Sequence, residues 1–336
     1  MRVLLSGYYG FGNLGDEAIL AGLAAALKSR GHVPVVLSGD PAATERLHGV
    51  RARPRITGLP RALASVDAVV SGGGGLLQDR TSARSLAYYL WVLRLARWSG
   101  RRVAVYGQSL GPLSDGGKAK LARELRGVPL FVRDRASLAL AAELGLEASL
   151  VGDAALLLGA GSKAPPANAG ASSGPVVLVP RGGFEGYNDA LTRLASALAE
   201  AGRRVAVMAL HPVEDLPPAR RLLAAAPAGE WLEPSTPAAA LELLKSARYV
   251  VSARLHGCIL AAVAGVGFAG LVYDPKVAGF LTQAGAPLFE EPVDDLDLLG
   301  VALAARPPDT AAIAALSGAA RRGIDELVAA LGAKPA

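Results

Sequence analysis

The 336-residue sequence contains few of the residues that form disulfides or metal sites: one cysteine, Cys258, and four histidines. A single cysteine excludes an internal disulfide, and no cysteine and histidine spacing resembles that of a metal site. We therefore expect a protein of a reducing compartment that has no structural metal and no cofactor. Cys258 lies just inside a predicted helix, and we interpret it as a packing residue rather than a nucleophile.

Long hydrophobic segments are also lacking. The longest uncharged run, Leu255–Tyr273, contains four glycines and His256. A membrane-spanning helix needs about 20 mainly apolar residues, so we interpret this run as a buried helix, a turn and a strand. The N-terminus leads directly into a predicted strand and has no signal-peptide pattern. We expect a cytoplasmic protein whose only membrane contact is peripheral, at the inner face.

Hydrophobic residues make up 51% of the chain, and its length exceeds the usual limit for one core, so two domains are expected. The net charge is +6, and the excess arginines are spread along the chain instead of forming a block. This charge favours an acidic ligand or an anionic membrane surface, and it argues against a nucleic-acid partner. A positive surface that only keeps the protein soluble is the alternative.

Short β-branched segments alternate with segments of helical periodicity. The predicted strands are Arg2–Leu5, Val33–Leu37, Ala68–Ser71, Arg102–Tyr106, Leu130–Val132, Val176–Val179, Val205–Leu210, Tyr249–Ser252 and Phe268–Tyr273. The predicted helices between them are Leu86–Ser99, Lys118–Arg126, Ser137–Leu144, Asp189–Ala201, Pro237–Ser246 and His256–Ala264. This alternation predicts an α/β fold of mostly parallel sheets, whose ligands bind at the carboxyl ends of the strands.

The domain organisation follows from one break in this alternation. Residues 161–174 are rich in alanine, glycine and proline without periodicity, which predicts a linker. We expect a Rossmann-like domain over residues 1–160, a second one over residues 175–305, and a long amphipathic helix within residues 306–336 that packs against either domain. The two domains are expected to face each other across a cleft.

The most informative segment is the loop between the first predicted strand and helix, Ser-Gly-Tyr-Tyr-Gly-Phe-Gly-Asn-Leu-Gly-Asp-Glu over residues 6–17. Its glycines allow close approach of the backbone to a ligand. Three aromatic residues offer flat faces beside exposed amides, a mixture that suits a sugar or a small anion. The residues concerned are Gly10, Gly12 and Gly15 among the glycines, and Tyr8, Tyr9 and Phe11.

Two other interpretations of this loop stay open. The spacing of Gly10, Gly12 and Gly15 matches a dinucleotide fingerprint, with Asp40 as the ribose-binding acid, but Gly7-Tyr8-Tyr9 lengthens the turn. The glycines alternatively serve only a tight turn. In either case Asp16 or Glu17 is a candidate cap of the following helix.

A second glycine-rich segment, Gly72-Gly73-Gly74-Gly75-Leu76-Leu77-Gln78-Asp79, follows the predicted strand Ala68–Ser71. Four consecutive glycines are costly in folding entropy, so a surface turn alone explains them poorly. We favour a ligand site lined by their amides, with Gly73 and Gly74 at its centre and Gln78 and Asp79 contacting hydroxyls.

A third group lies in the second half: Ser252-Ala253-Arg254-Leu255-His256-Gly257, followed by Tyr273-Asp274-Pro275-Lys276. Both segments follow predicted strands, so Arg254, His256 and Lys276 are expected to converge. A guanidinium and an ammonium bind a carboxylate or phosphate, and an imidazole transfers a proton near neutral pH. The pattern indicates a site for a small acid that undergoes proton transfer, with His256 as the catalytic group.

Three further groups are weighed. Arg133 is a candidate anion ligand, and the alternative is an ion pair with an N-cap at Asp134. Arg181, with two glycines after it, follows the first strand of the second half and is a candidate for the same anion. The other histidines, His32, His48 and His211, are interpreted as surface or packing residues.

The ordered set of motifs resembles the polysaccharide pyruvyl transferase family, especially its bacterial cell-wall, CsaB-type branch. The resemblance rests on the glycine and aromatic loop, the four-glycine segment, Phe131-Val132-Arg133-Asp134, Ser-Ala-Arg-Leu-His-Gly and Asp-Pro-Lys, and it extends from about residue 1 to about residue 330. It implies two Rossmann-like domains in a GT-B-like arrangement.

The resemblance also implies an activity. A pyruvyl group is transferred from phosphoenolpyruvate to two hydroxyls of a sugar, which gives a cyclic ketal and releases phosphate. In the cell-wall branch the acceptor is an N-acetylmannosamine residue of a lipid-linked oligosaccharide, and the ketal is a ligand for S-layer homology domains.

The residues take roles under this resemblance. Arg254, Lys276 and Arg133 are expected to bind phosphoenolpyruvate, and His256 to protonate its methylene carbon. Tyr8, Phe11 and Asn13 are expected to bind the sugar, with Asp16 as hydroxyl acceptor or base. A GT-B glycosyltransferase that uses a nucleotide-sugar, and a non-catalytic sugar or anion sensor, are the competing interpretations.

Overall fold

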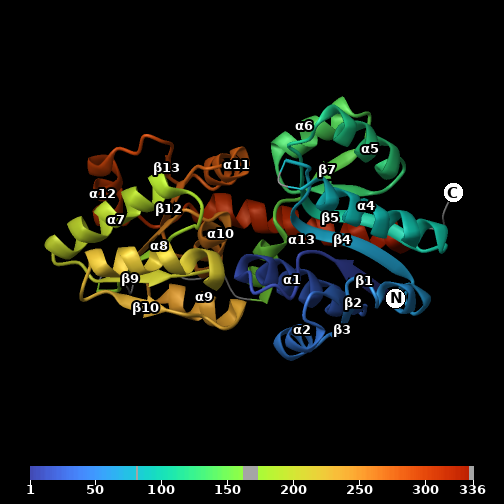
Figure 1. Ribbon diagram of the computed structural model, residues 1–336, viewed down its shortest axis with the longest axis horizontal. Helices are drawn as coiled ribbons and strands as arrows, with labels where there is room; N and C mark the ends of the chain where they lie inside the picture. The colour runs from blue at the N-terminus through green and yellow to red at the C-terminus, as the bar shows by residue number, and fades with distance from the viewer. Residues whose placement is uncertain (81, 162–172, 333–336) are drawn as a thin grey trace. The chain divides into compact units, whose positions relative to one another are not determined.

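The computed structural model describes residues 1–80, 82–161 and 173–332, and these divide into two compact units. Unit 1 comprises Met1–Gly12, Asp16–Ala160 and the chain from Ser317 onward. Unit 2 comprises Asn13–Gly15 and the described residues between Gly161 and Leu316. Most of the predicted linker, residues 162–172, lies outside the described residues. Figure 1 labels the helices and strands.

The described residues of unit 1 form one parallel sheet of seven strands in the order β3-β2-β1-β4-β5-β6-β7. The strands are β1 (Arg2–Ser6), β2 (Val33–Ser38), β3 (Arg51–Pro54), β4 (Ala68–Leu77), β5 (Arg102–Leu110), β6 (Leu130–Val132) and β7 (Ala148–Leu150). The helices are α1 (Leu14–Lys28), α2 (Pro41–His48), α3 (Leu59–Ala64), α4 (Ala83–Trp98), α5 (Asp115–Leu125), α6 (Arg135–Glu143) and the 3-10 helix η1 (Ala154–Gly161).

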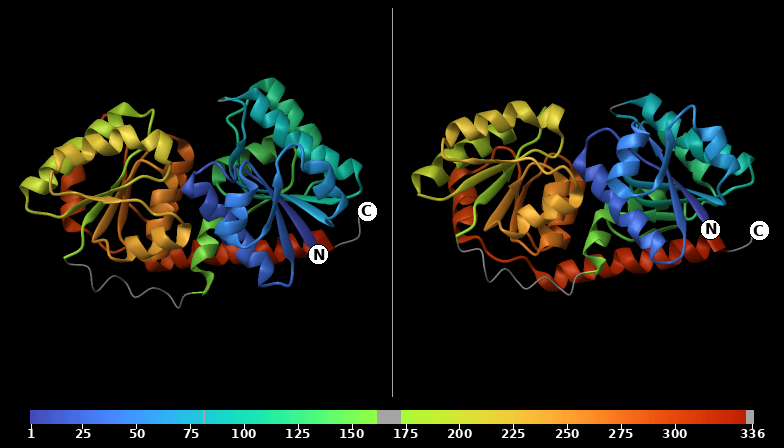
Figure 2. Two further views of the ribbon diagram at one scale, coloured as in Figure 1. Left: turned by 60° about the horizontal axis from the view of Figure 1, so that its bottom comes forward. Right: turned by 90° about the horizontal axis from the view of Figure 1, so that it is seen from below.

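Helices cover both faces of this sheet (Figures 1 and 2). On one face, buried side chains of α3, α4 and α5 pack on alternate residues of β1, β4 and β5, such as Leu4, Val69 and Val105. The other face receives α1 and the last turns of α13 (Thr310–Gly332), where the Tyr106 hydroxyl of β5 donates a hydrogen bond to the Ala320 carbonyl at 2.6 Å. The C-terminal helix, which the sequence left open to either domain, therefore ends on unit 1.

Unit 2 repeats the architecture with a parallel sheet of six described strands, ordered β10-β9-β8-β11-β12-β13. The strands are β8 (Val176–Val179), β9 (Val205–Met208), β10 (Glu230–Leu232), β11 (Tyr249–Ser252), β12 (Phe268–Leu271) and β13 (Leu288–Phe289). The helices are α7 (Glu185–Glu200), α8 (Pro212–Ala225), α9 (Pro237–Lys245), α10 (Leu255–Ala264), α11 (Pro275–Gln283) and α12 (Asp295–Ala304). Two helix-covered parallel sheets confirm the predicted α/β class.

Local sequence explains where many helices begin. The side chain of the residue before the helix accepts a hydrogen bond from an amide of the first turn, which satisfies a donor that would otherwise lack a partner. The capping residues are Asp40, Ser82, Ser114, Asp134, Thr236, Asp274 and Asp294.

Two strands of unit 1 extend well beyond their predicted ends, and one of them, β5, runs to Leu110 instead of Tyr106. Strand β4 does not stop at Ser71 but continues through the four glycines to Leu77, with an irregularity in its pairing to β5 between Gly74 and Leu77. Gly73 and Gly74 have φ angles of 71° and 86°, which L-amino acids with a side chain rarely adopt. Because the strand signal of β-branched residues ends at Val70, the sequence pattern could not show this extension.

Each sheet has a topological switch point, where the strand order reverses. The loops that follow the two adjacent strands there lead to opposite faces of the sheet, which leaves a crevice at the carboxyl edge. In unit 1 this point lies between β1 and β4, and in unit 2 between β8 and β11. Ligands of open α/β sheets bind at such points. The glycine and aromatic loop of residues 6–17 (the first signature) and the four-glycine segment of residues 72–79 (the second signature) flank the switch point of unit 1. The segments after Val179 and Ser252 flank that of unit 2.

Candidate active-site residues in the two units

In unit 1 the loop after β1 is fixed by Tyr9, which is only 1% exposed. Its hydroxyl donates a hydrogen bond to the Gly72 carbonyl at 2.5 Å, and burial raises its pKa well above the usual value. Gly7 and Gly72 make room for it, since a Cβ at Gly7 would lie 2.3 Å from the ring. The expectation that Tyr9 offers its face to a ligand was therefore wrong, because the ring joins the two signatures from inside.

Tyr8 and Phe11 lie differently. Their rings stack with centroids 4.3 Å apart and an interplanar angle of 16°, and both residues are partly exposed. The guanidinium of Arg55 lies 5.3 Å from the Phe11 ring centre and 4.1 Å from that of Tyr88. Sequence reasoning missed Arg55 and Tyr88, since neither lies in a recognisable motif and only the fold brings them to the loop.

The side chain of Glu17 holds the backbone of the same loop. Its carboxylate accepts a hydrogen bond from the Gly10 amide at 2.8 Å and lies 2.7 Å from Nε2 of His48. The two side chains are 6% and 3% exposed. His48 is thus not merely a surface or packing residue, as the sequence suggested, but one half of a buried polar pair that fixes the loop.

Asp16 is half-buried beside the second signature, since a Cβ at Gly74 would lie 3.4 Å from its Oδ1 atom. Helix α1 begins at Leu14, so Asp16 and Glu17 lie within its first turn instead of capping it from outside. Carboxylates in a first turn interact favourably with the helix dipole. Asp40 caps α2 through Ala43, which gives this acid a structural use.

The four-glycine segment owes part of its composition to packing. A Cβ at Gly73 would lie 2.0 Å from Cγ2 of Ile19, and one at Gly72 would lie 2.8 Å from Cδ2 of Leu23. Both neighbours belong to α1, which therefore lies very close to β4. Ligand contact through the amides of this segment stays a prediction.

The polar residues after the glycines are placed separately. Gln78 is half-buried. Asp79 accepts hydrogen bonds from the Ser114 hydroxyl at 2.6 Å and the Ser114 amide at 2.9 Å, and these bonds lower its pKa. Asp79 thus joins the end of β4 to the start of α5, a structural use that sequence reasoning did not foresee.

Arg133 is buried in unit 1, with 7% of its surface exposed. Its Nε donates to the Ser109 hydroxyl at 2.6 Å and its Nη1 to Asp153 at 2.8 Å, while Asp134 caps α6. These contacts are those of the ion pair with N-cap that the sequence offered as the alternative to anion binding.

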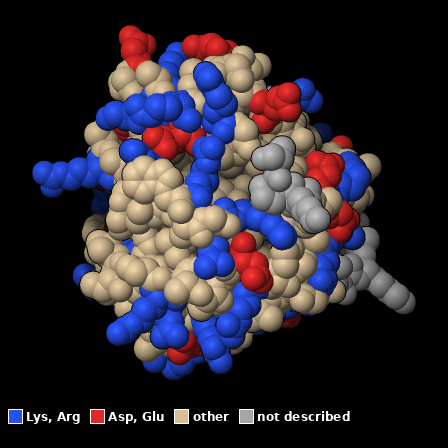
Figure 3. Space-filling view, turned by 90° about the vertical axis from the view of Figure 1, so that its right-hand side faces the viewer, with Lys and Arg blue, Asp and Glu red and all other residues tan. Residues whose placement is uncertain are grey.

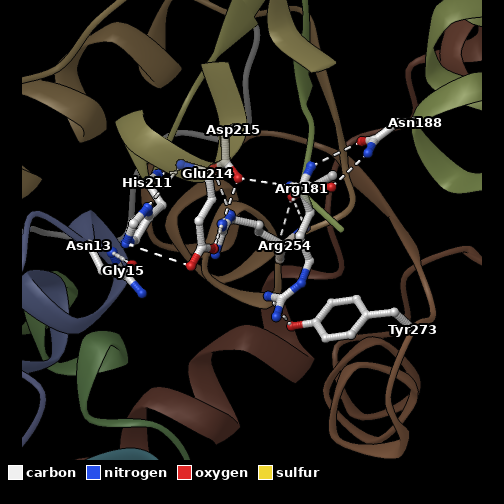
Figure 4. Close-up of polar contacts among 11 residues, drawn as sticks. Asn13, Gly15, Arg181, Asn188, His211, Glu214, Asp215, Arg254 and Tyr273 are labelled. Carbon is white, nitrogen blue, oxygen red and sulfur yellow. Dashed lines mark hydrogen bonds and ion pairs between the residues drawn. The ribbon is translucent and has the colours of Figure 1, made fainter. Parts of the chain in front are cut away.

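The carboxyl edge of unit 2 is organised by Asp215, whose side chain is fully buried (Figure 4). It accepts hydrogen bonds from the amides of Gly182 and His211 at 3.1 and 2.9 Å. Arg254 donates to it through Nε at 2.6 Å and through Nη2. One carboxylate therefore ties together the loops that follow β8, β9 and β11, and no motif in the sequence pointed to it.

Arg254 also donates to Glu214 through Nη2 at 2.9 Å. Burial alone would lower the pKa of Arg254, but the hydrogen bonds to Asp215 and Glu214 outweigh it and raise the pKa. Among the described residues, no partner is found for Nη1, which keeps two N–H donors. Arg254 is thus held in place with part of its guanidinium unused.

Arg181 is held both at its backbone and at its guanidinium. Its amide donates to Oδ1 of Asn188 and its carbonyl accepts from Nδ2 of the same side chain, at 3.1 and 2.7 Å. Its guanidinium lies 4.1 Å from the Tyr273 ring centre and 4.8 Å from that of Phe184, and Nη1 donates to the Tyr273 hydroxyl at 3.1 Å. Within the described ranges no carboxylate lies within ion-pair distance of it.

His256 occupies the first turn of α10, two residues after Arg254, and is half-buried. It lies against Gly15, where a Cβ would be 2.4 Å from its Nδ1 atom. The short segment Asn13–Gly15 is itself fixed in unit 2: Asn13 accepts from the Gly15 amide at 3.0 Å, and Leu14 donates to the Leu210 carbonyl at 2.8 Å. Only a glycine at position 15 allows the imidazole this close.

Lys276 lies in the first turn of α11. Its Nζ is 3.2 Å from Oδ2 of Asp274 and 5.9 Å from the centre of the Tyr273 ring. Tyr273 thus has Arg181 against its ring and Lys276 near it. The loops of unit 2 bring both cations to one aromatic side chain. The N-terminus of α11 lies in the same segment, and the positive end of its dipole also favours a bound anion.

The remaining candidates have structural surroundings. Cys258 is fully buried, and burial raises the pKa of its thiol to about 12, as expected for a packing residue. His211 caps α8 by accepting from the Glu214 amide at 3.3 Å.

Over the described residues, no group of three or more histidine, cysteine or acidic side chains is placed to hold a metal ion. None of the described helices is long and apolar enough to span a membrane.

A family model described as polysaccharide pyruvyl transferase matches residues 13–275. The chain belongs to this family. The match includes the four-glycine segment, Arg133, Arg181, Arg254 and His256. Within the polysaccharide pyruvyl transferase family the chain is a transferase, which confirms the coarser part of the prediction. No curated protein matches the chain.

Solved structures with a similar fold are glycosyltransferases and epimerases. UDP-GlcNAc 2-epimerase from Neisseria meningitidis, solved with UDP-GlcNAc, has a TM-score of 0.63 at 12% identity and covers 98% of this chain and 100% of that chain. S. aureus MnaA with UDP has a TM-score of 0.62 at 12% identity, over 100% of this chain and 99% of that chain. A glycosyltransferase from Rickettsia africae ESF-5 has a TM-score of 0.57 at 13% identity, over 98% of this chain and 96% of that chain. At this identity the similarity shows the fold alone, and it confirms a GT-B-like fold for this pyruvyl transferase family member.

Proposed function

We propose that this chain transfers a pyruvyl group from phosphoenolpyruvate to a sugar and forms a cyclic ketal on two of its hydroxyls. The observation that carries the proposal is the set of basic groups around Tyr273 and α10 at the carboxyl edge of unit 2, in a chain of the pyruvyl transferase family. The proposed acceptor is an N-acetylmannosamine residue of a lipid-linked cell-wall precursor, as in the CsaB-type branch.

Arg181 is proposed as the main ligand of the donor. Phosphoenolpyruvate carries a carboxylate and a phosphate, and a guanidinium binds either group with two parallel hydrogen bonds. The Asn188 side chain fixes the backbone of Arg181, and the Tyr273 and Phe184 rings hold its guanidinium, so little side-chain entropy is lost on binding. Lys276 adds a second positive charge, and Nη1 of Arg254 supplies further donors.

His256 is proposed as the general acid. Protonation of the methylene carbon makes the adjacent carbon electrophilic, and a sugar hydroxyl attacks it and loses its proton. The bond between that carbon and the phosphate oxygen then breaks, and a second hydroxyl forms the second carbon–oxygen bond. Of the two hydroxyl protons, one balances the proton given to the methylene and the other leaves with phosphate, so His256 is regenerated.

The acceptor is proposed to lie on unit 1. The stacked rings of Tyr8 and Phe11 offer a partly exposed aromatic surface, and Arg55 beside them supplies hydrogen-bond donors. Asp16, close to Gly74, is the proposed hydroxyl acceptor or base. These placements support a sugar site there and a donor site at the edge of unit 2.

The decisive experiment measures phosphate released from phosphoenolpyruvate in the presence of a lipid-linked disaccharide that ends in N-acetylmannosamine. Phosphate release and a product mass increased by one pyruvyl ketal are expected. A nucleotide-sugar with the same acceptor is the control. Turnover of the nucleotide-sugar alone would identify a glycosyltransferase, and tight binding of phosphoenolpyruvate without any turnover would identify a sensor.

Two variants assign the roles. His256→Gln is expected to lower kcat by about 10²- to 10⁴-fold, the usual contribution of a general acid, with unchanged unfolding. Arg181→Ala is expected to raise the KM for phosphoenolpyruvate about tenfold or more, since it removes charged hydrogen bonds. Near-normal turnover of the first, or an unchanged KM in the second, would remove that residue from its role. Arg254→Ala is less informative because it leaves the buried carboxylate of Asp215 without its charged partner and therefore destabilises the fold as well.

A further inference from the structure

Helix α4 of unit 1 has an outer face of unusual composition. Its inner face is apolar and buried, as expected for a helix that covers a sheet. The outward positions, spaced alternately three and four residues apart, are all exposed: Arg84, Ala87, Trp91, Arg94 and Trp98. The two tryptophans are 43% and 69% exposed. An outer face of tryptophan and arginine is atypical of a helix that only meets water.

The C-terminal end of this face opens into a basic hollow of about 660 Å³, lined by Arg94, Arg97, Trp98, Arg123 and Glu124. Arg94 lies 4.4 Å from the Trp98 ring centre. The lone acid, Glu124, pairs with Arg123 at 3.0 Å, and the Arg97 guanidinium donates to the Glu124 carbonyl. Three guanidinium groups against one carboxylate leave the hollow positively charged.

The edge of the sheet formed by the amino ends of the strands, near which α4 ends, carries more positive charge. Arg2 begins β1, Arg102 begins β5, and Arg126 follows α5, so arginines collect where these strands begin. Figure 3 shows the side of the molecule toward which α4 ends in Figure 1, where Lys and Arg side chains lie among uncharged ones, with fewer Asp and Glu. A neighbouring hollow of about 590 Å³ is lined by residues 125–131 and 145–149.

We propose that this face, defined by Trp91, Trp98, Arg94, Arg97 and Arg123, binds the surface of an anionic lipid bilayer. Tryptophan rings locate at the boundary between headgroups and acyl chains, and arginines nearby attract anionic headgroups. Either feature alone is common, but a positive surface that only confers solubility does not require two exposed tryptophans beside the arginines. The charge of the face is complementary to phosphate headgroups.

The position of the face suits the proposed lipid-linked acceptor, although the inference does not depend on it. The Tyr88 ring lies 6.4 Å from that of Trp91 and is also the ring on which Arg55 stacks. The membrane-binding face therefore extends along α4 to Tyr88, which contacts the same Arg55 that lies beside the proposed sugar site. A lipid-linked substrate would remain near its bilayer.

The test measures binding to vesicles without any substrate, so that failure of the catalytic proposal leaves it intact. Vesicles of phosphatidylcholine alone are compared with vesicles that also contain phosphatidylglycerol, by co-sedimentation at low and high salt. Binding is expected only to the anionic vesicles and is expected to weaken with salt. The variant R94E/R123E is expected to bind about tenfold more weakly or worse. Its matched control, R203E/R220E, makes the same charge change at exposed arginines of unit 2 and is expected to retain binding.

Fluorescence provides a second measurement that needs no surface variant. The chain has three tryptophans, so Trp231→Phe leaves only the two on α4. Their emission is expected to shift to the blue with anionic vesicles and to be quenched by brominated lipids. Equal loss of binding in both charge variants, an unshifted emission, or displacement by soluble glycerol phosphate at low concentration would overturn the proposal.

Discussion

At the residue scale, the functional candidates are held by charged and polar groups that are themselves buried. Asp215 joins three loops of unit 2, and the pair of Glu17 and His48 holds the Gly10 amide in unit 1. Burying a charge is costly unless hydrogen bonds compensate it. These groups therefore serve to fix loop positions, which a site for a small anion or a sugar requires.

The role of His48 leads to a prediction at this scale. His48→Ala removes the partner of one Glu17 oxygen and leaves that carboxylate incompletely hydrogen-bonded in a buried place. The free energy of unfolding is expected to fall by about 1–3 kcal/mol, and the KM for the sugar acceptor is expected to rise while that for phosphoenolpyruvate does not. Urea unfolding and steady-state kinetics measure both.

His48→Gln is the control, because a glutamine amide can donate to the same carboxylate. It is expected to restore most of the stability. If His48→Ala raised both KM values equally, the pair would not act through the loop.

At the scale of elements, the close packing of α1 on β4 determines the second signature. Glycine is required at position 73 both by its positive φ angle and by Ile19, whereas Gly12 has a similar φ of 75° with no atom within 4 Å of an added Cβ. The two positions separate backbone strain from steric conflict.

Gly12→Ala is expected to cost about 1–2 kcal/mol from the left-handed backbone alone. Gly73→Ala adds overpacking against α1, which typically costs another 1–3 kcal/mol. Urea unfolding of the two variants measures the difference. Equal destabilisation would mean that α1 moves away from β4 at little cost, contrary to the tight packing described here.

At the scale of the whole molecule, both units bury tyrosines in their cores. Tyr9, Tyr89 and Tyr106 in unit 1 and Tyr249 in unit 2 have pKa values that burial raises above the usual value. In the unfolded chain these hydroxyls ionise near pH 10. Their contribution to stability is therefore complete below about pH 10 and is lost as the pH rises further, because only the unfolded state then releases protons.

We expect the urea midpoint to fall steeply above about pH 10, together with the appearance of tyrosinate absorbance. Tyr249→Phe removes one such group and is expected to make the decline of unit 2 shallower. A midpoint that stays constant well into the alkaline range would contradict the burial of these side chains.

The sequence alone determined the α/β class, the positions of the central strands along the chain and the family. Buried central strands carry a local signal of β-branched residues, and the predicted bounds of Leu130–Val132, Val176–Val179 and Tyr249–Ser252 were correct. Family motifs are likewise local. The edge strands β3, β7, β10 and β13 were missed because they are short and partly exposed, so their residues show no such pattern.

Only the tertiary structure decided how the candidate residues are held. Asp215, Asn188, Arg55 and His48 lie in no motif, and all except Asn188 contact residues far from them in the chain. The glycines at positions 15 and 73 are explained by His256 and Ile19, which only folding brings against them. A sequence pattern records which residues are adjacent along the chain, whereas hydrogen bonds and close packing depend on separation in space.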